Sequence, residues 1–228
     1  MSRTLAVARM QLINKWTYIG WPLTILAASF LMSLAIFALI PVNEGKYGGG
    51  SQAPMWYFLV LGIQSMTLVF PFSQGLSISR RAFYLGTLGL FSVIALGMTA
   101  LYLLGGAIEG ATNGWGVYGY YFKIPWVTDG PWYSTAAFFF VVMMFMFIIG
   151  FWFATIFKRW GTTGTLVSTL GTAVALIGLA ALTTLLEWWG SVGAWFAQQS
   201  PLSISGWAAL LCVVLAACSY ATLRRATP

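Results

Sequence analysis

Six long apolar runs separated by short polar segments make up most of the chain. Each run is close to the roughly 20 residues that a helix needs to cross the hydrocarbon core of a bilayer. The pattern therefore predicts an all-α polytopic membrane protein, in which residues 1–228 form a single transmembrane domain. The expected spans cover residues 21–40, 55–72, 82–107, 134–157, 162–186 and 204–223.

Composition excludes the main alternatives to a membrane protein. Apolar residues make up 60% of the chain and charged residues only 7%, whereas a soluble domain carries about 25% charged residues. A soluble globular enzyme would lack a charged exterior, and intrinsic disorder requires low hydrophobicity and high charge. The six spans also leave no room for a soluble domain of typical size.

The few charges follow the expected topology. Nine of the eleven Lys and Arg residues fall in the segments on the side of the two termini, and the four acids Glu44, Glu109, Asp129 and Glu187 fall on the opposite side. Because cytoplasmic loops of membrane proteins are enriched in Lys and Arg, both termini are expected in the cytoplasm. This asymmetry accounts for the net charge of +7 without a nucleic-acid partner.

Residues 2–15 form a separate feature before the first span. Apolar residues recur at spacings of three and four, and cations stand between them, which predicts a helix lying in the inner membrane interface. An ordinary basic tail beside the membrane is the alternative. The residues that carry this pattern are Arg3, Leu5, Ala8, Arg9, Leu12 and Lys15.

Several kinds of chemistry are missing from the chain. It has no His, and Cys212 and Cys218 are separated by about 9 Å of helix rise, too far for a disulfide between them. The centres of the spans carry no ionisable residue, and no lysine follows the glycine pattern of a phosphate-binding loop. We therefore expect no catalytic, metal or nucleotide site in this chain, which disfavours an intramembrane enzyme.

The segment between the second and third spans is the most informative one. Pro71 is expected to end or kink the span, Gly75 permits a turn, and Ser77 or Ser79 can cap a short helix. Arg80 and Arg81 then mark the headgroup level. A plain hairpin with a stop-transfer arginine pair is the alternative interpretation.

The order of an interfacial helix, six spans and a basic loop after the second span resembles the membrane subunits of ABC-2-type ABC transporters. Residues 70–87 look like the short bacterial form of these permeases, in which a turn rich in Gly, Ser and Arg precedes an aromatic residue and a Gly-Thr pair. The resemblance implies a coupling helix that contacts a separate ATP-binding subunit. Its residues would be Gln74, Gly75, Leu76, Ser77, Ile78, Ser79, Arg80 and Arg81.

The resemblance also implies the rest of the assembly. Residues 2–15 would be the connecting helix, and two permease chains, identical or different, would pair in membrane lipid. ATP and Mg²⁺ would bind to the partner subunit, so this chain itself would hold no cofactor. Such a complex would lie in the inner (plasma) membrane of a bacterium.

Two segments on the outer side remain open to interpretation. The family usually has a re-entrant hairpin before the last span, and the corresponding segment here, 187–201, is too short to cross the bilayer. It could dip into the outer leaflet as a gate or lie on the headgroups. Residues 115–133, rich in aromatics and Gly, could bind a peptide or lipid, or anchor and pack. The gate residues would be Glu187, Trp188, Trp189, Trp195 and Phe196.

Small residues predict where membrane helices approach one another closely. Gly164, Ser168 and Thr172 stand at i, i+4 and i+8 in the fifth span, and Gly89 and Gly97 share a face of the third. The Phe and Met residues between 138 and 153 are expected to face lipid or the core.

The expected function is that of a permease subunit of an ATP-driven exporter. The absence of charge at mid-depth favours an apolar or amphipathic cargo, such as a peptide, lipid or drug. The alternative is a non-transporting membrane factor for assembly, sensing or immunity that binds lipid or peptide.

Overall fold

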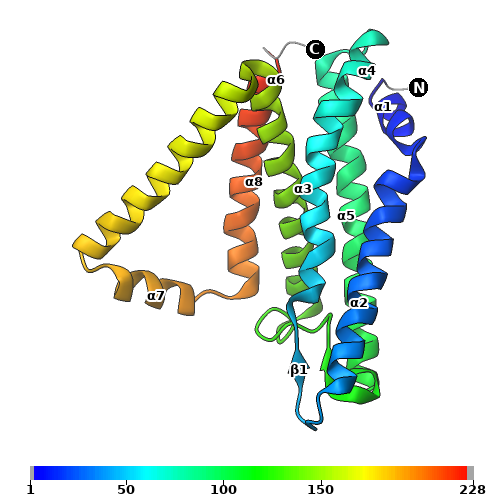
Figure 1. Ribbon diagram of the computed structural model, residues 1–228, viewed down its shortest axis with the longest axis vertical. Coiled ribbons are helices and arrows are strands. Elements are labelled where there is room, and N and C mark those ends of the chain that lie inside the picture. The colour runs from blue at the N-terminus through cyan, green and yellow to red at the C-terminus, as the bar shows by residue number, and fades with distance from the viewer. Residues whose placement is uncertain (1–2, 225–228) are drawn as a thin grey trace.

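The computed structural model describes residues 3–224, and these fold as an all-α protein. Five helical segments are long and apolar enough to cross a membrane, which indicates a helical membrane protein (Figure 1). They cover Trp16–Leu39, Gly49–Gly75, Arg80–Ala111, Trp132–Leu185 and Pro201–Leu223.

The first part of the chain forms a short helix and two long helical rods. Helix α1 (Arg3–Leu12) leads through a π-helical turn at Trp16–Gly20 into α2 (Trp21–Leu39). Helices α3 (Ala53–Gln64) and α4 (Phe70–Gly75) are joined by a second π-helical turn at Ser65–Val69. Because a π-helical turn widens the helix without ending it, the second expected span is one continuous helical rod.

Between α2 and α3, the chain forms a short connection away from α1. Strand β1 (Lys46–Tyr47) pairs in parallel with β2 (Gly119–Tyr120), and a 3₁₀ turn at Gly49–Gln52 follows β1. Lys46 donates from Nζ to the carbonyl oxygens of Phe37 (2.8 Å) and Ile40 (2.7 Å). A cation at the carboxyl end of α2 satisfies carbonyls that have no partner within the helix.

Helix α5 (Arg80–Ala111) is the longest uninterrupted one. It begins at Ser79, whose hydroxyl oxygen accepts a hydrogen bond from the amide of Ala82 at 3.3 Å. This N-cap satisfies one of the free amides of the first turn. The helix ends before Asn113, which has a left-handed backbone with φ of 49°, so it exceeds the expected span at both ends.

Helix α6 (Trp132–Leu185) joins the fourth and fifth expected runs and contains a sharp break at Gly161. Gly161 has φ of 67° and ψ of −162°, a conformation that is essentially restricted to glycine. We call residues 132–160 the first arm and residues 162–185 the second arm. The two arms diverge strongly, and the second leads away from the other helices (Figure 1).

The last two helices bring the chain back to the bundle. Helix α7 (Trp189–Ala197) runs across the direction of the long helices, and α8 (Pro201–Leu223) returns along the first arm of α6 (Figure 1). The second arm, α7 and α8 form the three sides of a triangle. We call the remaining part, α1–α5, the first arm and α8, the bundle.

The core of the bundle lies where α3, α5 and the first arm meet. Phe58, Phe91 and Phe147 are fully buried there. Gly62 and Gly150 allow the backbones of α3 and α6 to touch: a Cβ on Gly62 would lie 2.2 Å from the carbonyl oxygen of Phe147, and one on Gly150 would lie 2.0 Å from that of Leu59. Membrane helices associate through such close packing, since lipid provides no hydrophobic drive.

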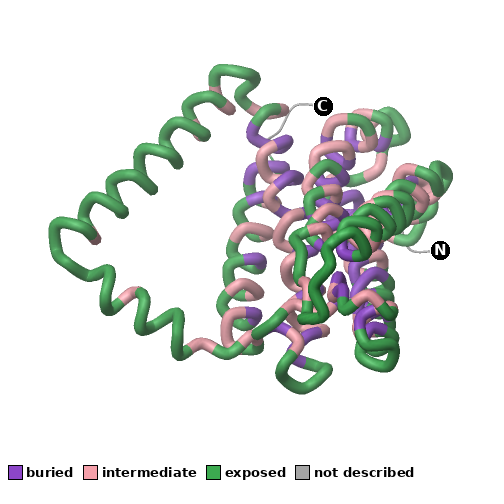
Figure 2. Tube along the Cα trace, turned by 60° about the horizontal axis from the view of Figure 1, so that its bottom comes forward, coloured by how far each residue is buried: buried purple, intermediate pink, exposed green. Residues whose placement is uncertain are grey.

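The second arm and α7 are exposed along almost their whole length (Figure 2). A Cβ on Gly164 would meet only Trp160 of the same helix, and one on Gly89 or Gly97 would have no atom within 4 Å. The close contacts expected at these glycines are therefore not formed within the described chain. The contacts that do form use Gly62 and Gly150 instead.

Candidate functional site at the basic end of the bundle

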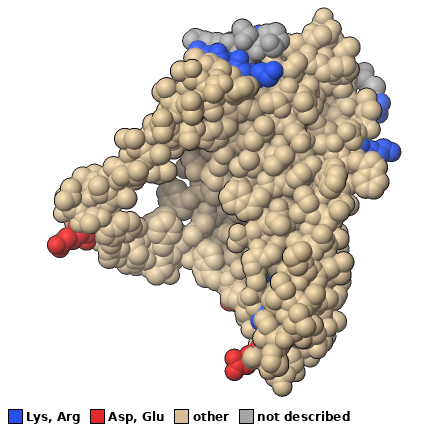
Figure 3. All heavy atoms as spheres, in the orientation of Figure 1, with Lys and Arg blue, Asp and Glu red and all other residues tan. Residues whose placement is uncertain are grey.

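Most of the described Lys and Arg side chains lie at one end of the molecule and the acids at the other, where Lys46 and Lys123 also lie (Figure 3). The basic end contains α1, the start of α5, the break in α6 and the end of α8. All four acids stand at the other end, after α2, in the last turn of α5, before α6 and after α6. The charge separation along the bundle axis is thus the one that the chain pattern predicts.

The expected coupling helix over 74–81 is not formed as a separate helix. Helix α4 ends at Gly75, residues 76–79 form a tight turn, and α5 begins at Arg80. Amides of the turn donate back to carbonyls of α4, from Ser77 to Gln74 at 2.9 Å and from Ile78 to Ser73 at 3.1 Å. These bonds end α4 in the way that left-handed helix caps do, and they leave no residues for another helical turn.

We call residues 76–79 the basic-end turn. Ser77 adopts the left-handed conformation, with φ of 54°, and the side chain of Gln74 donates to the carbonyl of Ile78 at 3.1 Å. Leu76 projects outward and is 56% exposed. The turn is therefore well hydrogen-bonded to the helices on both sides and presents an apolar side chain at its surface.

The two adjacent arginines differ in their surroundings. Arg80 donates from Nη1 to the carbonyl oxygens of Leu223 (3.3 Å) and Arg224 (2.6 Å), at the carboxyl end of α8. Free carbonyls at a helix end favour a cation. Arg81 is exposed and faces a hollow beside Tyr84 and Tyr220. Arg80 therefore has a structural role, while Arg81 is exposed and makes part of the lining of this hollow.

Helix α1 is seated on the first turns of α5 by Gly86 and Thr87, the Gly-Thr pair noted in the sequence. A Cβ on Gly86 would lie 2.6 Å from the carbonyl oxygen of Thr4 and 2.8 Å from Cβ of Val7. Beside it, Gln11 donates from Nε2 to the hydroxyl of Thr87 at 2.8 Å. The pair thus provides both the close approach and a buried hydrogen bond between the two helices.

The face of α1 that packs differs from the apolar face expected for membrane contact. Val7 and Gln11 are buried against the bundle, whereas Leu5 is 46% exposed and Ala8 and Leu12 are half-buried. The buried face is set by the contact with α5, which periodicity in α1 alone does not specify. Arg9 and Lys15 are exposed, and the side chain of Arg3 lies outside the part of the chain that the structure describes.

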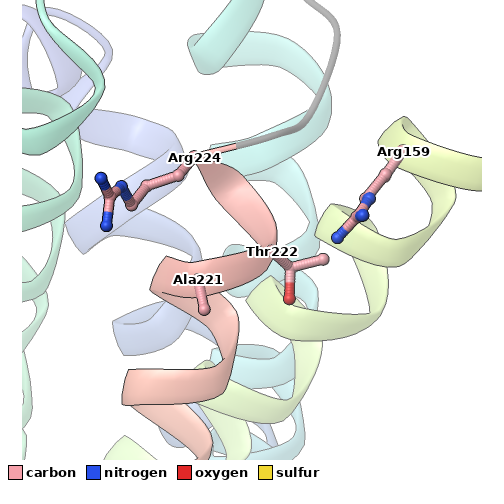
Figure 4. Close-up of a pocket in the computed structure, with 4 residues that line it drawn as sticks. All are labelled: Arg159, Ala221, Thr222 and Arg224. Atoms are coloured by element: carbon pink, nitrogen blue, oxygen red, sulfur yellow. The ribbon is translucent and has the colours of Figure 1, made fainter.

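A second hollow at the basic end lies between the break of α6 and the end of α8. It has a volume of about 530 Å³ and is lined by Arg159, Ala221, Thr222 and Arg224. In Figure 4, Arg159 reaches toward Thr222, whereas Arg224 points to the opposite side of α8. The guanidinium of Arg159 also stacks on Trp160, with Cζ 4.1 Å from the ring centroid. The two arginines therefore do not converge on one anion.

At the other end, where the acids lie, the structure contains a buried carboxylate whose burial the chain pattern does not predict. Glu109 is fully buried. Its two oxygens accept hydrogen bonds from three consecutive amides and one indole: Tyr121 N (2.7 Å), Phe122 N (2.9 Å), Lys123 N (2.9 Å) and Trp115 Nε1 (3.0 Å). A carboxylate with this many donors tolerates burial, and here it fixes the course of the loop after α5.

The aromatic segment that follows packs against its own chain. The ring of Phe30 in α2 contacts the rings of Trp115, Tyr121 and Phe122. The Tyr121 hydroxyl lies 2.6 Å from that of Ser29 and donates to the carbonyl of Gly50 at 3.1 Å. Burial raises the pKa of Tyr121, so the phenol stays protonated and can donate. The structure thus favours the packing interpretation of this segment.

The segment expected as a re-entrant gate contains one short helix instead of a hairpin. Helix α7 has no buried residue, and Trp189, Trp195 and Phe196 are each about half exposed. Glu187 takes a left-handed conformation with φ of 54° at the turn after α6, and Trp188 is the N-cap of α7. The shape agrees with the alternative in which the segment lies along the headgroups.

Comparison of the chain with protein-family models, with curated proteins and with solved structures found no match.

Proposed function

We propose that the protein is the six-span permease subunit of an ABC-2-type transporter, with its basic end in the cytoplasm of a bacterial cell and its spans in the plasma membrane. The break at Gly161 supports the six-span topology. The second arm contains 24 residues and is about 36 Å long, which exceeds the roughly 30 Å of the hydrocarbon core. Each arm of α6 can therefore cross the bilayer once.

The observation that carries the proposal is the construction of the basic-end turn. It joins the rod formed by α3 and α4 directly to α5, and its hydrogen bonds to α4 make it stiff. A partner pressing on Leu76 would move both rods together. Helix α1, seated on α5 through Gly86 and Thr87, would move with them. A separate ATP-binding subunit is the partner that the family resemblance implies for this position.

The exposed second arm supports an assembly with a second permease chain. Leu170, Val174 and Ile177 are more than 60% exposed, and a Cβ on the nearby Gly171 or Gly178 would have no atom within 4 Å. A small-residue face of this kind allows another membrane helix to approach closely. The cargo path would then lie between the two chains. The absence of charged residues at mid-depth in the spans favours an apolar or amphipathic cargo.

The first test is whether a reading frame next to the gene encodes an ATPase with a phosphate-binding loop, and such an ATPase is then co-expressed with the chain. The wild-type chain is expected to co-purify with that ATPase and to raise its ATP hydrolysis in proteoliposomes. Leu76→Glu should reduce both signals about ten-fold, because a buried apolar contact is replaced by a desolvated charge. Arg80 is unsuitable for this test, since its replacement would also uncap α8.

The matched control is Leu39→Glu, because Leu39 is 82% exposed at the opposite end. It should purify and stimulate the ATPase like the wild type. Failure of the wild-type chain to bind an ATPase would refute the transporter proposal and favour the non-transporting membrane factor. Unchanged coupling in Leu76→Glu would refute only the role of the basic-end turn.

A further inference from the structure

Two hollows lie next to each other on the surface between α5 and α8. The first, of about 470 Å³, lies at the basic end, and the second, of about 260 Å³, continues toward the middle of the bundle. They share Ala216 of α8. We call the two together the α5–α8 groove.

The walls of the groove stand apart because α5 and α8 both pack on the first arm of α6. They meet near the basic end, where the rings of Tyr84 and Tyr220 lie 5.1 Å apart and the Tyr84 hydroxyl donates to the carbonyl of Ala216 at 2.6 Å. Farther along, Phe140 and Met144 of α6 contribute to the floor between the two helices.

The groove has the length of one membrane leaflet. On α5 it follows Arg81, Leu85, Leu88 and Ser92, which lie at i, i+4, i+7 and i+11 on one helix face. Eleven residues rise about 16.5 Å, and half of the hydrocarbon core is about 15 Å. With Arg81 at the headgroup level, the other end of the groove lies near the bilayer midplane.

Polarity along the groove is confined to its basic end. The hydroxyl of Ser92 donates to the carbonyl of Leu88 at 2.9 Å, so it is satisfied within its helix. The remaining lining in the second hollow is almost entirely aliphatic, aromatic or sulfur-containing. At the other end, Arg81 is exposed, and the four acids of the chain all stand at the opposite end of the molecule.

We propose that the α5–α8 groove binds one anionic phospholipid, with its phosphate on Arg81 and one acyl chain along the groove. A planar guanidinium can donate two parallel hydrogen bonds to a phosphate. An aliphatic groove one leaflet long fits a single acyl chain, and the chain would fill the space between α5 and α8. Arg80 cannot replace Arg81 in this role, because it already donates to the end of α8.

Lipid binding at one site differs from the general attraction of cations to an anionic membrane. Such attraction acts on every Lys or Arg near the surface, whatever its position. A site on Arg81 predicts in addition a dependence on that one residue and on the free volume of the groove. It does not depend on the presence of an ATP-binding partner.

The test measures lipid retention by the purified full chain with native mass spectrometry, after exchange into bilayer discs of phosphatidylcholine with or without phosphatidylglycerol. The wild type should retain one phosphatidylglycerol in preference to phosphatidylcholine. Arg81→Gln should lower this preference about ten-fold, as expected for the loss of a charge-assisted hydrogen bond. Arg81→Lys should give an intermediate value, because it keeps the charge and loses the planar fork.

A second variant tests the acyl-chain part of the site. Ala209 is half-buried at the midplane end of the groove, and Ala209→Phe should reduce retention of both lipids while the preference for the anionic headgroup persists. Val214→Phe is its control on an exposed position of α8 outside the groove, and Lys15→Gln is the control for Arg81→Gln. Both controls should behave like the wild type.

Each contrary result would overturn the proposal. Equal effects of Arg81→Gln and Lys15→Gln would show general surface attraction in place of a site. Unchanged retention in a monodisperse Ala209→Phe variant would show that the groove holds no acyl chain. A wild-type chain that retains neither lipid preferentially would exclude a selective site altogether.

Discussion

The bundle and the second arm of α6 use the same residue type in opposite environments. Gly62 and Gly150 sit where two backbones of the bundle touch, whereas Gly171 and Gly178 of the second arm have no neighbouring atom within 4 Å of a Cβ position. Both regions consist of apolar helices. A small residue in an apolar helix thus marks a place that another helix can approach, but the approaching helix can belong to the same chain or to another molecule.

The two arms of α6 differ in the same way in their large side chains. In the first arm, Phe139, Met143 and Phe147 are fully buried, which places the expected Phe and Met cluster in the core. The second arm carries mainly Leu, Val, Ala and Thr, and it is exposed. Because lipid is as apolar as the core, burial of aromatic rings in a bundle stabilises mainly through dispersion and fit.

The largest effect is expected from a side chain at the touching glycines. Gly150→Leu would place atoms against the carbonyl of Leu59, where a Cβ alone would lie 2.0 Å away. The backbones of α3 and α6 would have to separate, at a cost above about 3 kcal/mol. We expect loss of the monodisperse peak in fluorescence-detected size-exclusion chromatography and a strongly reduced thermal transition.

Gly178→Leu in the second arm is the matched control, because its Cβ position is open. It should elute and melt like the wild type. Equal loss of folded protein in both variants would contradict the distinction between a packed bundle and an unpacked arm.

The next largest effect on stability is expected at one of two acids that lie at the same end of the molecule. Glu109→Ala removes the acceptor of four hydrogen bonds inside the bundle, and buried donors left unpaired should destabilise the fold by about 3 kcal/mol. Glu187→Ala, at the exposed end of the second arm, should change stability by less than about 0.5 kcal/mol. Thermal unfolding and hydrogen exchange of the amides of residues 121–123 measure the difference. Protection of those amides that persists in Glu109→Ala would disprove the role of this carboxylate.

These two acids also show what sequence could predict and what it could not. Hydropathy and charge are local properties, so the apolar helices and the separation of charges follow directly from the chain pattern. The burial of Glu109 depends on a loop that turns its amides inward. A signal was present, because an acid precedes a Gly-rich segment whose backbone amides need acceptors, but that pattern alone does not say which amides would reach it.

Contacts between distant segments explain the other differences. Arg80 and Arg81 differ in role because only Arg80 donates to the end of α8. Leu223, one of its two acceptors, is 143 residues away in the sequence. The packing face of α1 depends in the same way on Gly86 and Thr87. The expected coupling helix was replaced by a turn because α4 remains helical as far as Gly75, so that too few residues are left before Ser79 caps α5.

A substitution at Gly171 tests whether the second arm pairs with another permease chain. If it does, Gly171→Leu should lower the dimer fraction about ten-fold by blocking close helix approach, equivalent to about 1.4 kcal/mol. Gly97→Leu is the control, since Gly97 is equally open but lies in α5 of the bundle. Light scattering coupled to size-exclusion chromatography in mild detergent measures the dimer fraction. A dimer that tolerates Gly171→Leu and loses stability with Gly97→Leu would place the contact on the bundle instead.

The smallest effect on stability is expected from removing a single hydroxyl group, which can be compared between the bundle and the second arm. Thr87→Val keeps the shape of the side chain and removes the partner of the buried Gln11 amide, at a cost of about 1 kcal/mol. The loss should be confined to α1, because the rest of the bundle packs without it, and faster proteolysis within residues 3–12 should report it. Thr183→Val in the second arm removes only a hydrogen bond to the carbonyl of Leu179 in its own helix, and this variant should show no change. Faster proteolysis of α1 in both variants, or in neither, would show that the hydrogen bond between Gln11 and Thr87 does not hold α1 on α5.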